Sequence, residues 1–389
     1  SQSKPFLNSP DMPNENLLQY FKGEGIDVSK KKILNCLNAK HHYISPNNFY
    51  SLRECSNYES LDFIYSKNLI NTSKFHRILI SEWFKFCKLG GKIIIEIQPN
   101  KLLNFDELIK ECKLLLKNKI NILFMEKNIL VLEKKKNYLK KKDSINCWSF
   151  GIITDGQRED WLENEINSII SLKIPHFEIL ICGPYNGEKR NVVKIVQFKS
   201  DKPLICAKKN LICKNAKYEN ICITHNKFIF NKNWYTGMKK YGNYFEILSC
   251  KIQDHDRTRA GDWITYGSKW DKISKIGLMN YMDWDKYGYL DGGLYILKKS
   301  VWKSVPWNSK LLWGEGEDLD ISRRFYENGY VSRINIFSIC NTLKWNHGKF
   351  KLFEFNNQKL GKIKHSCNYP IWYLKQLIKK YLLRRKING

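Results

Sequence analysis

The first third of the chain alternates short apolar runs with amphipathic segments. Continuous apolar runs predict buried strands, and apolar residues three or four positions apart predict helices. On this basis we predict strands at residues 33–37, 61–66 and 92–97, helices at 16–22, 74–87 and 105–117, and a closing hairpin of 121–125 with 128–133. Such an alternation indicates an α/β layered structure.

The rest of the chain continues this alternation from residue 147. The predicted strands are 147–153, 178–182, 220–227, 246–252 and one that follows Gly293; the predicted helices are 158–172, 207–216 and one that begins at Asp318. Near the end, apolar residues within 371–382 share one helical face, with basic residues between and after them. This pattern is typical of a helix on an anionic membrane surface, and equally of a helix docked on the protein with a basic outer face.

Composition restricts the class of protein. With 389 residues, 43% of them hydrophobic and 14% aromatic, the chain is long enough for two domains and is globular. A formal charge of +28 favours anionic partners, namely nucleic acid, an acidic membrane surface or phosphate-bearing substrates. Nucleic acid is not expected, because zinc-ligand spacing, an RNA-binding aromatic signature and a helix-turn-helix are all missing from the sequence.

The twelve cysteines lack any CxxC spacing, and most stand singly in apolar runs. With no secretory signal in the sequence, they are predicted to be buried thiols of a reducing cytosol. No run of the sequence approaches the roughly 18 apolar residues that a membrane-spanning helix needs.

The densest candidate chemistry lies at residues 315–320, which hold four carboxylates. Glu317 and Asp318 precede a helical pattern, so acidic capping of a helix is one explanation. Gly314 and Gly316 favour a second one, because glycine lets the backbone turn tightly and approach a ligand. A carboxylate pair on such a turn suits a general base or a metal ligand.

This stretch resembles the late Glu-Asp motif of family-2-type glycosyltransferases of the GT-A fold. The resemblance covers residues 147–350, and its most specific parts are 313–318 and the strand–helix opening at 148–172. It implies a Rossmann-like nucleotide-binding domain. It also implies that Asp318, or Glu317, deprotonates an acceptor hydroxyl that attacks the anomeric carbon with inversion.

The resemblance further implies which residues bind the nucleotide-sugar donor. Members of this family contact the nucleotide at the turn after the first strand and lay the sugar against a Gly-Gly turn. The donor-binding residues implied here are Thr154, Asp155, Gly156, Lys208, Asn210, Asp291, Gly292 and Gly293. For residues 154–156 an ordinary turn between strand and helix is the alternative.

Two positions depart from the family pattern. The acidic residue that usually contacts the ribose is replaced at residues 183–186 by Gly-Pro-Tyr-Asn, and the Asp-x-Asp position for a divalent cation reads Thr-His-Asn at 224–226. Mg²⁺ and Mn²⁺ prefer carboxylate oxygens, so two alternatives follow. Either His225 and Asn226, with the late His347, bind the metal ion, or cationic side chains neutralise the diphosphate without metal.

A second charged loop spans residues 254–263. We interpret it as an active-site loop in which Arg257 and Arg259 contact phosphate and Asp262 positions the acceptor. The alternatives are salt bridges within a surface loop and metal binding by its first three residues. Trp313 and Glu315 are further candidates for contact with acceptor or phosphate.

The N-terminal part carries a separate resemblance. Residues 61–95 contain a strand, a helix, the pair Gly90-Gly91 and a further strand, which looks like the second half of a class I SAM-dependent methyltransferase. The glycine-rich turn that should follow the first strand is missing, so SAM is not expected as a cofactor. The predicted division is an arm (1–30), a degenerate methyltransferase-like α/β domain (31–133), a solvated basic linker (134–146), the GT-A domain (147–350) and a basic amphipathic tail (351–389).

These features predict a glycosyltransferase that uses a nucleotide-sugar donor and a glycan or lipid-linked acceptor in surface polysaccharide or capsule synthesis. It is expected in the cytoplasm, or peripherally at the inner face of an anionic membrane. The alternative is a non-catalytic nucleotide- or sugar-binding scaffold with a degenerate metal site. The altered residues 224–226 favour the scaffold, and the intact carboxylates near Asp318 favour the enzyme.

Overall fold

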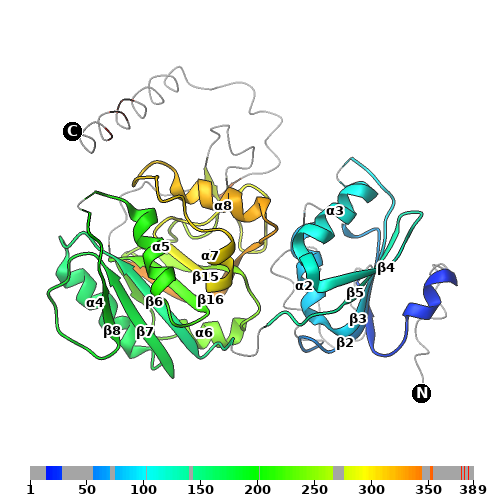
Figure 1. Ribbon diagram of the computed structural model, residues 1–389, viewed down its shortest axis with the longest axis horizontal. Helices are drawn as coiled ribbons and strands as arrows, with labels where there is room; N and C mark the ends of the chain where they lie inside the picture. Colours follow the sequence, from blue (N-terminus) through cyan, green and yellow to red (C-terminus); the bar gives the residue numbers. More distant parts are fainter. Residues whose placement is uncertain are drawn as a thin grey trace.

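The computed structural model describes residues 15–28, 56–70, 75–101, 103–139, 143–200, 202–265, 276–343 and 351–353, together with Ile378, Tyr381 and Arg384. These residues form two bodies, each built on a β-sheet of its own (Figure 1). The smaller body holds the described residues up to 139, and the larger one begins at residue 143. The architecture is mixed α/β, as the alternation of strands and helices predicts.

The smaller body is built on a five-stranded sheet in the order β1-β2-β3-β5-β4. Its strands are β1 (Gly25–Asp27), β2 (Leu61–Lys67), β3 (Cys87–Glu96), β4 (Ile120–Glu126) and β5 (Ile129–Lys134). Helices α2 (His76–Phe86) and α3 (Phe105–Leu116) pack on Ile93 and Ile95 of β3. The 3-10 helix η1 (Glu15–Tyr20) packs near Ile94 on the other face, and η3 (Lys117–Lys119) follows α3.

The predicted strands, helices and hairpin of this body are confirmed to within a few residues, except for the strand at 33–37, which lies outside the described residues. Strand β1 pairs in parallel with β2, so the predicted arm contributes a strand to the sheet. The methyltransferase-like character of this body stays a prediction.

The larger body is built on an eight-stranded sheet in the order β10-β16-β11-β15-β9-β6-β7-β8. Its strands are β6 (Cys147–Ile153), β7 (His176–Cys182), β8 (Val193–Val196), β9 (Asn220–His225), β10 (Phe228–Phe230), β11 (Ile247–Gln253), β15 (Leu294–Lys298) and β16 (Ser332–Thr342). Strands β9, β6, β7 and β8 are parallel, whereas β15 runs antiparallel to both of its neighbours.

Helices cover both faces of this sheet. On one face α4 (Glu159–Ser171) and α6 (Trp234–Tyr241) pack on Phe150 and Ile152 of β6. On the other lie α5 (Ile205–Asn215), α7 (Lys299–Ser304) and α8 (Glu317–Glu327). Strands covered on both faces are expected to be apolar throughout, which explains the continuous apolar runs in the sequence.

A small third sheet supports the start of α8. It consists of β12 (Ile264–Thr265), β13 (Gly277–Leu278) and β14 (Gly288–Tyr289), in the order β13-β12-β14. Leu319, in the first turn of α8, packs against the apolar cluster of this sheet. The carboxylates at the start of α8 are therefore held by tertiary packing as well as by the helix itself.

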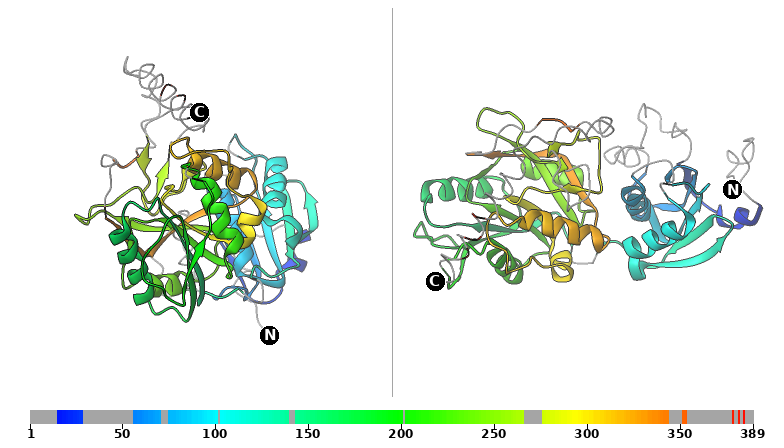
Figure 2. Two further views of the ribbon diagram at one scale, coloured as in Figure 1. Left: turned by 60° about the vertical axis from the view of Figure 1, so that its left-hand side comes forward. Right: turned by 90° about the horizontal axis from the view of Figure 1, so that it is seen from above.

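The two bodies pack closely. Arg333 on β16 pairs with Glu82 on α2, and both side chains are almost fully buried. The ring of Tyr244 stacks against those of Tyr58 and Tyr138, with centroids 3.9 and 5.6 Å away. Seen from above, α8 extends from the larger body toward the smaller one (Figure 2).

The prediction of a solvated linker at 134–146 was wrong at Lys134 and Asp143. Lys134 ends β5 with no exposed surface and pairs with Glu59 at 3.0 Å. The side chain of Asp143 is 7% exposed and pairs with Lys298 at 2.9 Å. The partners lie 75 and 155 positions away in the sequence, so a local charge run could not reveal them. Buried charges of this kind persist because they are paired.

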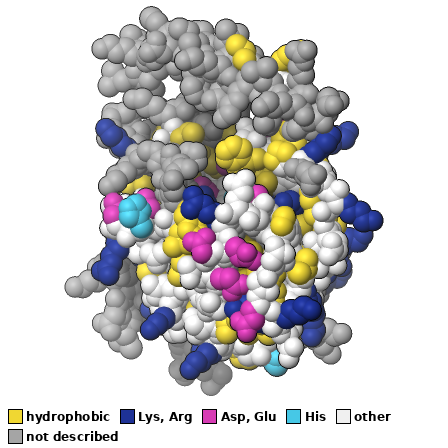
Figure 3. Space-filling model, turned by 90° about the vertical axis from the view of Figure 1, so that its left-hand side faces the viewer, with side chains coloured by type: hydrophobic (Ala, Val, Ile, Leu, Met, Phe, Trp, Pro, Cys, Tyr) yellow, Lys and Arg dark blue, Asp and Glu magenta, His cyan; other side chains and the backbone are white. Residues whose placement is uncertain are grey.

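Charge is unevenly distributed over the surface. Acidic side chains gather in the middle of the face shown in Figure 3, with Lys and Arg around them. This is the side on which Figure 1 places α4, whose first turn carries Glu159 and Asp160. A large anionic partner is therefore expected to approach from another direction.

The nine described cysteines are all free, and all but Cys147 are buried, which confirms the predicted buried thiols for this part of the chain. In the same part, helices long and apolar enough to cross a membrane are not found. Of the predicted amphipathic tail (351–389), the described residues are 351–353, where Leu352 forms a β-bridge with Leu278, and Ile378, Tyr381 and Arg384, which are helical and exposed.

Candidate active site

The turns that follow β6, β7 and β9 lie together at one edge of the sheet of the larger body. The register pairs Ile153 at the end of β6 with Cys182 and His225, so the parallel strands β6, β7 and β9 end together. Strand β15 runs the opposite way and starts at this edge, with Leu294 beside Thr224. In open α/β sheets, ligands bind outside the carboxyl ends of the parallel strands.

Hydrogen bonds tie the turn after β6 to its neighbours. Thr154 Oγ1 accepts from the amide of Gly156 at 3.0 Å and from Nδ2 of Asn226 at 3.1 Å. At Gly183, which has φ +137°, an added Cβ would lie 2.1 Å from the carbonyl oxygen of Thr154. Glycine at this departure from the family pattern therefore lets the turns after β6 and β7 pack closely. Asp155 is exposed beside them.

The Gly-Gly turn before β15 lies directly against the start of α8. The carboxylate of Asp291 accepts from the amide of Gly293 at 2.7 Å, and the Gly293 carbonyl accepts from the amide of His225 at 3.0 Å. A Cβ added at Gly292 would lie 2.9 Å from Oε1 of Glu317. The absence of a side chain at Gly292 is what allows α8 to approach.

Asp318 is the group in this cluster best suited to proton transfer. Helix α8 starts after Gly316, which has the left-handed φ of +77°. Glu317, the first residue of the helix, is buried. Burial, followed by the nearby carboxylates of Glu317 and Asp291, raises the pKa of Asp318 to about 7. Near neutral pH such a carboxyl group exchanges protons readily, as a general base must.

Two lysines of α5 reach the same edge. Lys208 Nζ donates to the Thr154 carbonyl at 2.8 Å, and Lys209 Nζ donates to the Gly292 carbonyl at 2.8 Å. Lys208 is partly exposed, whereas Lys209 is fully buried. Burial lowers the pKa of Lys209, and the carboxylates, with Glu317 first, act in the opposite direction.

His225 ends β9 in a positively charged environment. Burial lowers its pKa well below the ordinary value, and Lys209, Lys227 and Lys208 add to the effect in that order. Its Nε2 atom is buried and makes no hydrogen bond. Within the described residues, three or more His, Cys, Asp or Glu side chains placed to bind a metal ion are not found, and His347 lies outside that part of the chain.

Asn210 has a role other than the predicted donor contact. Its Oδ1 accepts from Trp302 Nε1 at 2.9 Å and from the Trp307 amide at 3.0 Å. Its Nδ2 donates to the Trp307 carbonyl and to Ser309 Oγ at 2.8 and 2.9 Å. The side chain thus joins α5 to the segment after α7.

The loop at 254–263 is held by its own ion pair. Arg259 Nε donates to Asp262 Oδ1 at 2.8 Å, and the Asp262 side chain has no exposed surface. Asp262 also accepts from the Tyr281 hydroxyl at 2.6 Å. We therefore correct the predicted role of Asp262: its carboxylate is enclosed by the protein, as in the salt-bridge alternative. Arg257 is exposed, with a φ of +64°.

Trp313 and Glu315 lie in the turn before α8. The indole of Trp313 is 55% exposed, one of the most exposed large apolar side chains in the described part of the chain. The carboxylate of Glu315 accepts from the Leu312 amide at 3.0 Å and from Arg384 Nε at 2.9 Å. Glu315 therefore closes the turn, and Trp313 is the member that faces solvent.

Sequence reasoning missed Glu165 on α4. This buried carboxyl group accepts from Thr224 Oγ1 and from the Phe228 amide, so it joins the two ends of the turn that carries His225. Burial raises its pKa to about 8. The available signal was an acidic residue among the apolar positions of the predicted helix, between Leu162 and Ile166.

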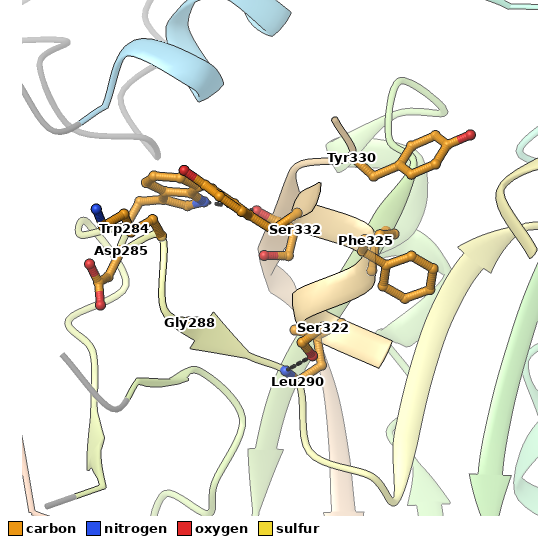
Figure 4. Close-up of a pocket in the computed structure, with 11 residues that line it drawn as sticks. Trp284, Asp285, Gly288, Leu290, Ser322, Phe325, Tyr330 and Ser332 are labelled. Carbon is orange, nitrogen blue, oxygen red and sulfur yellow. Dashed lines mark hydrogen bonds between the residues drawn. The ribbon is translucent and has the colours of Figure 1, made fainter. Parts of the chain in front are cut away.

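A small pocket adjoins the carboxylate cluster (Figure 4). Its wall includes Leu290, which precedes Asp291, and Ser322, which lies one turn after Asp318 on α8. The Leu290 amide donates to Ser322 Oγ at 3.4 Å, and Trp284 Nε1 donates to the Ser332 carbonyl at 3.3 Å. The remaining wall combines the aromatic rings of Phe325, Tyr326 and Tyr330 with Ile247, Asp285, Lys286 and Gly288.

Comparisons with known proteins give similarities to solved structures alone. No family model matches the chain, and no curated protein matches its sequence. Residues 1–349 of S. aureus TarS match with 13% identity and a TM-score of 0.37, over 51% of this chain and 60% of that one. The structure of the same TarS residues in complex with UDP-GlcNAc matches with 14% identity and a TM-score of 0.38, over 52% of this chain and 60% of that one. The structure of GalNAc-T7 with UDP, GalNAc and Mn²⁺ matches with 13% identity and a TM-score of 0.38, over 52% of this chain and 45% of that one. The chain thus spans less than two thirds of each of these proteins.

Proposed function

We propose that this chain is a glycosyltransferase of the GT-A type, which transfers a sugar from a nucleotide-sugar donor to a hydroxyl group of a glycan or lipid-linked acceptor. The position of Asp318 carries the proposal. Its carboxyl group lies beside the Gly292 turn, at the edge of the sheet where the parallel strands end. Its pKa of about 7 suits a general base at neutral pH.

We propose that different turns bind the nucleotide and the sugar of the donor. We assign the nucleotide to the Thr154 turn and to Lys208, whose ammonium group is held at that turn. We assign the sugar to the Gly-Gly turn, where the backbone at 292–293 carries no side chains and Asp291 offers carboxylate oxygens to sugar hydroxyls. The Gly-Gly turn borders Glu317 and Asp318 of α8, so this assignment places the donor sugar beside the base.

The proposed reaction is a single displacement. The acceptor oxygen bonds to the anomeric carbon while the bond from that carbon to the diphosphate oxygen breaks. Asp318 takes the hydroxyl proton, and the nucleoside diphosphate leaves with the bonding electrons. Such a displacement inverts the anomeric configuration. A positioned base typically contributes about 10²–10⁴-fold to the rate.

We also propose that the acceptor is presented at the inner face of an anionic membrane, as in surface polysaccharide or capsule synthesis. Support comes from the formal charge of +28 and from the exposed helical residues Ile378 and Tyr381. Co-sedimentation should then be stronger with phosphatidylglycerol vesicles than with phosphatidylcholine vesicles, and should weaken at high salt. Equal binding to both vesicles would contradict the membrane proposal.

Donor hydrolysis tests the transferase proposal. UDP-, GDP-, CMP- and TDP-linked sugars are incubated with the chain, and release of free sugar is measured. Asp318→Asn keeps the shape of the side chain and removes the base, so we expect a loss of about 10²–10⁴-fold. Asp320→Asn, on the same helix and paired with Arg324, is the matched control.

The outcomes separate the enzyme from a binding scaffold. Hydrolysis or transfer that depends on Asp318 supports the transferase. Binding of a nucleotide sugar, measured as a rise in melting temperature, without any turnover in the wild-type chain would support the non-catalytic scaffold instead. Turnover that survives Asp318→Asn would remove Asp318 as the base.

A further inference from the structure

The end of β9 is surrounded by fixed positive charge. Lys208, Lys209 and Lys227 all act on the charge of His225, so their ammonium groups lie within electrostatic range of the imidazole. They come from two different elements, α5 and the turn after β9, which the fold brings to the same edge. The clustering is therefore a tertiary feature, and no local charge run produces it.

Backbone carbonyl groups hold two of these lysines in position. Lys208 bonds to the Thr154 carbonyl and Lys209 to the Gly292 carbonyl, each at 2.8 Å. Those carbonyls belong to the two turns that we assign to the nucleotide and the sugar. An ammonium group has three N–H donors, so one backbone bond leaves Lys208, which is partly exposed, with donors for a ligand. Lys209 is buried, so it contributes through its charge, which acts on His225, and not through contact with solvent.

The same environment does not fit a divalent cation. The side chains at the expected metal position are the imidazole of His225 and the amide of Asn226, and neither carries the negative charge of a carboxylate. Mg²⁺ and Mn²⁺ favour carboxylate oxygens, and the three lysines would repel a dication placed at His225. An anion at this position would gain from all three charges.

We infer that the end of β9 binds the diphosphate group of the donor, with lysine side chains in the place of a divalent metal ion. The inference rests on the proposed function, because it names how that same site holds its donor. When the bond from the anomeric carbon to the diphosphate oxygen breaks, the electron pair stays on the diphosphate. Lys208 is then placed to stabilise the added negative charge, while the acceptor proton goes to Asp318.

The test is nucleotide binding without metal. The protein is treated with EDTA, and titration calorimetry measures binding of UDP, GDP, CDP and dTDP and of the matching nucleosides. We expect one diphosphate to bind with the same affinity in EDTA and in Mn²⁺. Lys208→Gln should weaken that diphosphate about 10- to 100-fold and leave the nucleoside unchanged, because one charged hydrogen bond is lost. Lys208→Arg should retain most of the affinity.

Matched controls exclude a general effect of charge. Lys214→Gln removes the same charge from an exposed position on the same helix and should leave binding unchanged. If Lys208→Gln fails to fold, Lys227→Gln takes its place, with the exposed Lys232→Gln as its control.

Three results would overturn the inference. Binding of the diphosphate only in the presence of Mn²⁺ or Mg²⁺ overturns it and leaves the proposed function standing. An equal effect of Lys208→Gln and Lys214→Gln does the same. If no nucleotide or nucleotide sugar binds under any condition, the proposed function fails and the inference fails with it.

Discussion

At the scale of single residues, the candidate site depends on how burial acts on charge. Asp318 and Glu317 adjoin each other and Asp291, and the protein excludes much of the water that would screen them. Lys209 is buried under the Gly292 turn and partly offsets this repulsion. The balance leaves the pKa of Asp318 at about 7, close to neutral pH, which suits the general base that we propose.

This balance predicts a pH profile. A general base acts when ionised, so kcat/KM of the wild-type chain should rise with pH through about 7 and then level off. Because Lys209 lowers the pKa of Asp318, Lys209→Met should move this rise to higher pH. The measurement is initial rate against pH for the wild type, Lys209→Met and the control Lys214→Met. A rise that stays at the same pH in Lys209→Met would show that another group controls it.

The site residues differ in how far the sequence could predict them. Asp318, Gly292 and Thr154 could be singled out from the sequence, because a carboxylate pair, a Gly-Gly turn and a strand-to-turn boundary are local patterns. The burial of Lys209 and Glu165 was not, since it depends on neighbours from distant strands. Asp262 was misassigned for the same reason: a charged loop looks identical in sequence whether its ions face a ligand or one another.

At the scale of elements, α4 controls the turn between β9 and β10. Glu165 accepts hydrogen bonds from the side chain of Thr224 and the backbone of Phe228, on either side of His225. Burial raises the pKa of Glu165 from 4.5 to about 8, so the group is protonated in the folded chain at neutral pH. A neutral acid can then stay buried without a cationic partner.

The shift predicts how stability depends on pH. The folded-state pKa lies above the unfolded value, so the contribution of Glu165 is complete below 4.5 and is lost as pH rises toward 8. Across this window the free energy of unfolding of the wild type should fall by up to about 1.4 kcal/mol per pH unit relative to that of Glu165→Gln, which does not titrate. Urea unfolding at pH 5 to 8 measures this difference. The exposed Glu159→Gln is the control, and parallel curves for wild type and Glu165→Gln would contradict the prediction.

At the scale of the whole molecule, the smaller body holds the far end of α8. Arg77 Nη1 donates to the Tyr326 carbonyl in the last turn of this helix at 2.5 Å, and the guanidinium lies 3.5 Å from the centre of the Tyr326 ring. Burial would raise the pKa of Glu111, but hydrogen bonds from His76 and Arg77 bring it down to about 2. A cation at the carboxyl end of a helix is favourable, and Asp318 stands at the other end.

This contact predicts that the smaller body contributes to catalysis by positioning α8. Arg77→Gln removes the paired bonds to Glu111 and frees the last turn of α8, so we expect stability to fall by about 1–3 kcal/mol. If Asp318 moves with the helix, kcat should fall about tenfold while the KM for the donor stays close to that of the wild type. The control is Arg190→Gln, whose ion pair with Glu163 belongs to the larger body.

The two readouts distinguish the possible roles of Arg77. Lower stability with an unchanged kcat would make the contact purely structural. Arg77→Lys keeps the charge but cannot reproduce the paired bonds to Glu111, so it should restore only part of kcat.

The sequence by itself determined the elements and the local chemistry of this protein. Strands such as β6 and helices such as α4 follow from apolar runs and helical spacing, because burial of these side chains requires those periodicities. Tertiary structure alone decided that β15 starts beside His225, that Lys208 and Lys209 of α5 lie near His225, and that Arg77 holds α8 from another body. These arrangements join residues far apart in the chain, and strand order and packing set them, which a local pattern does not encode.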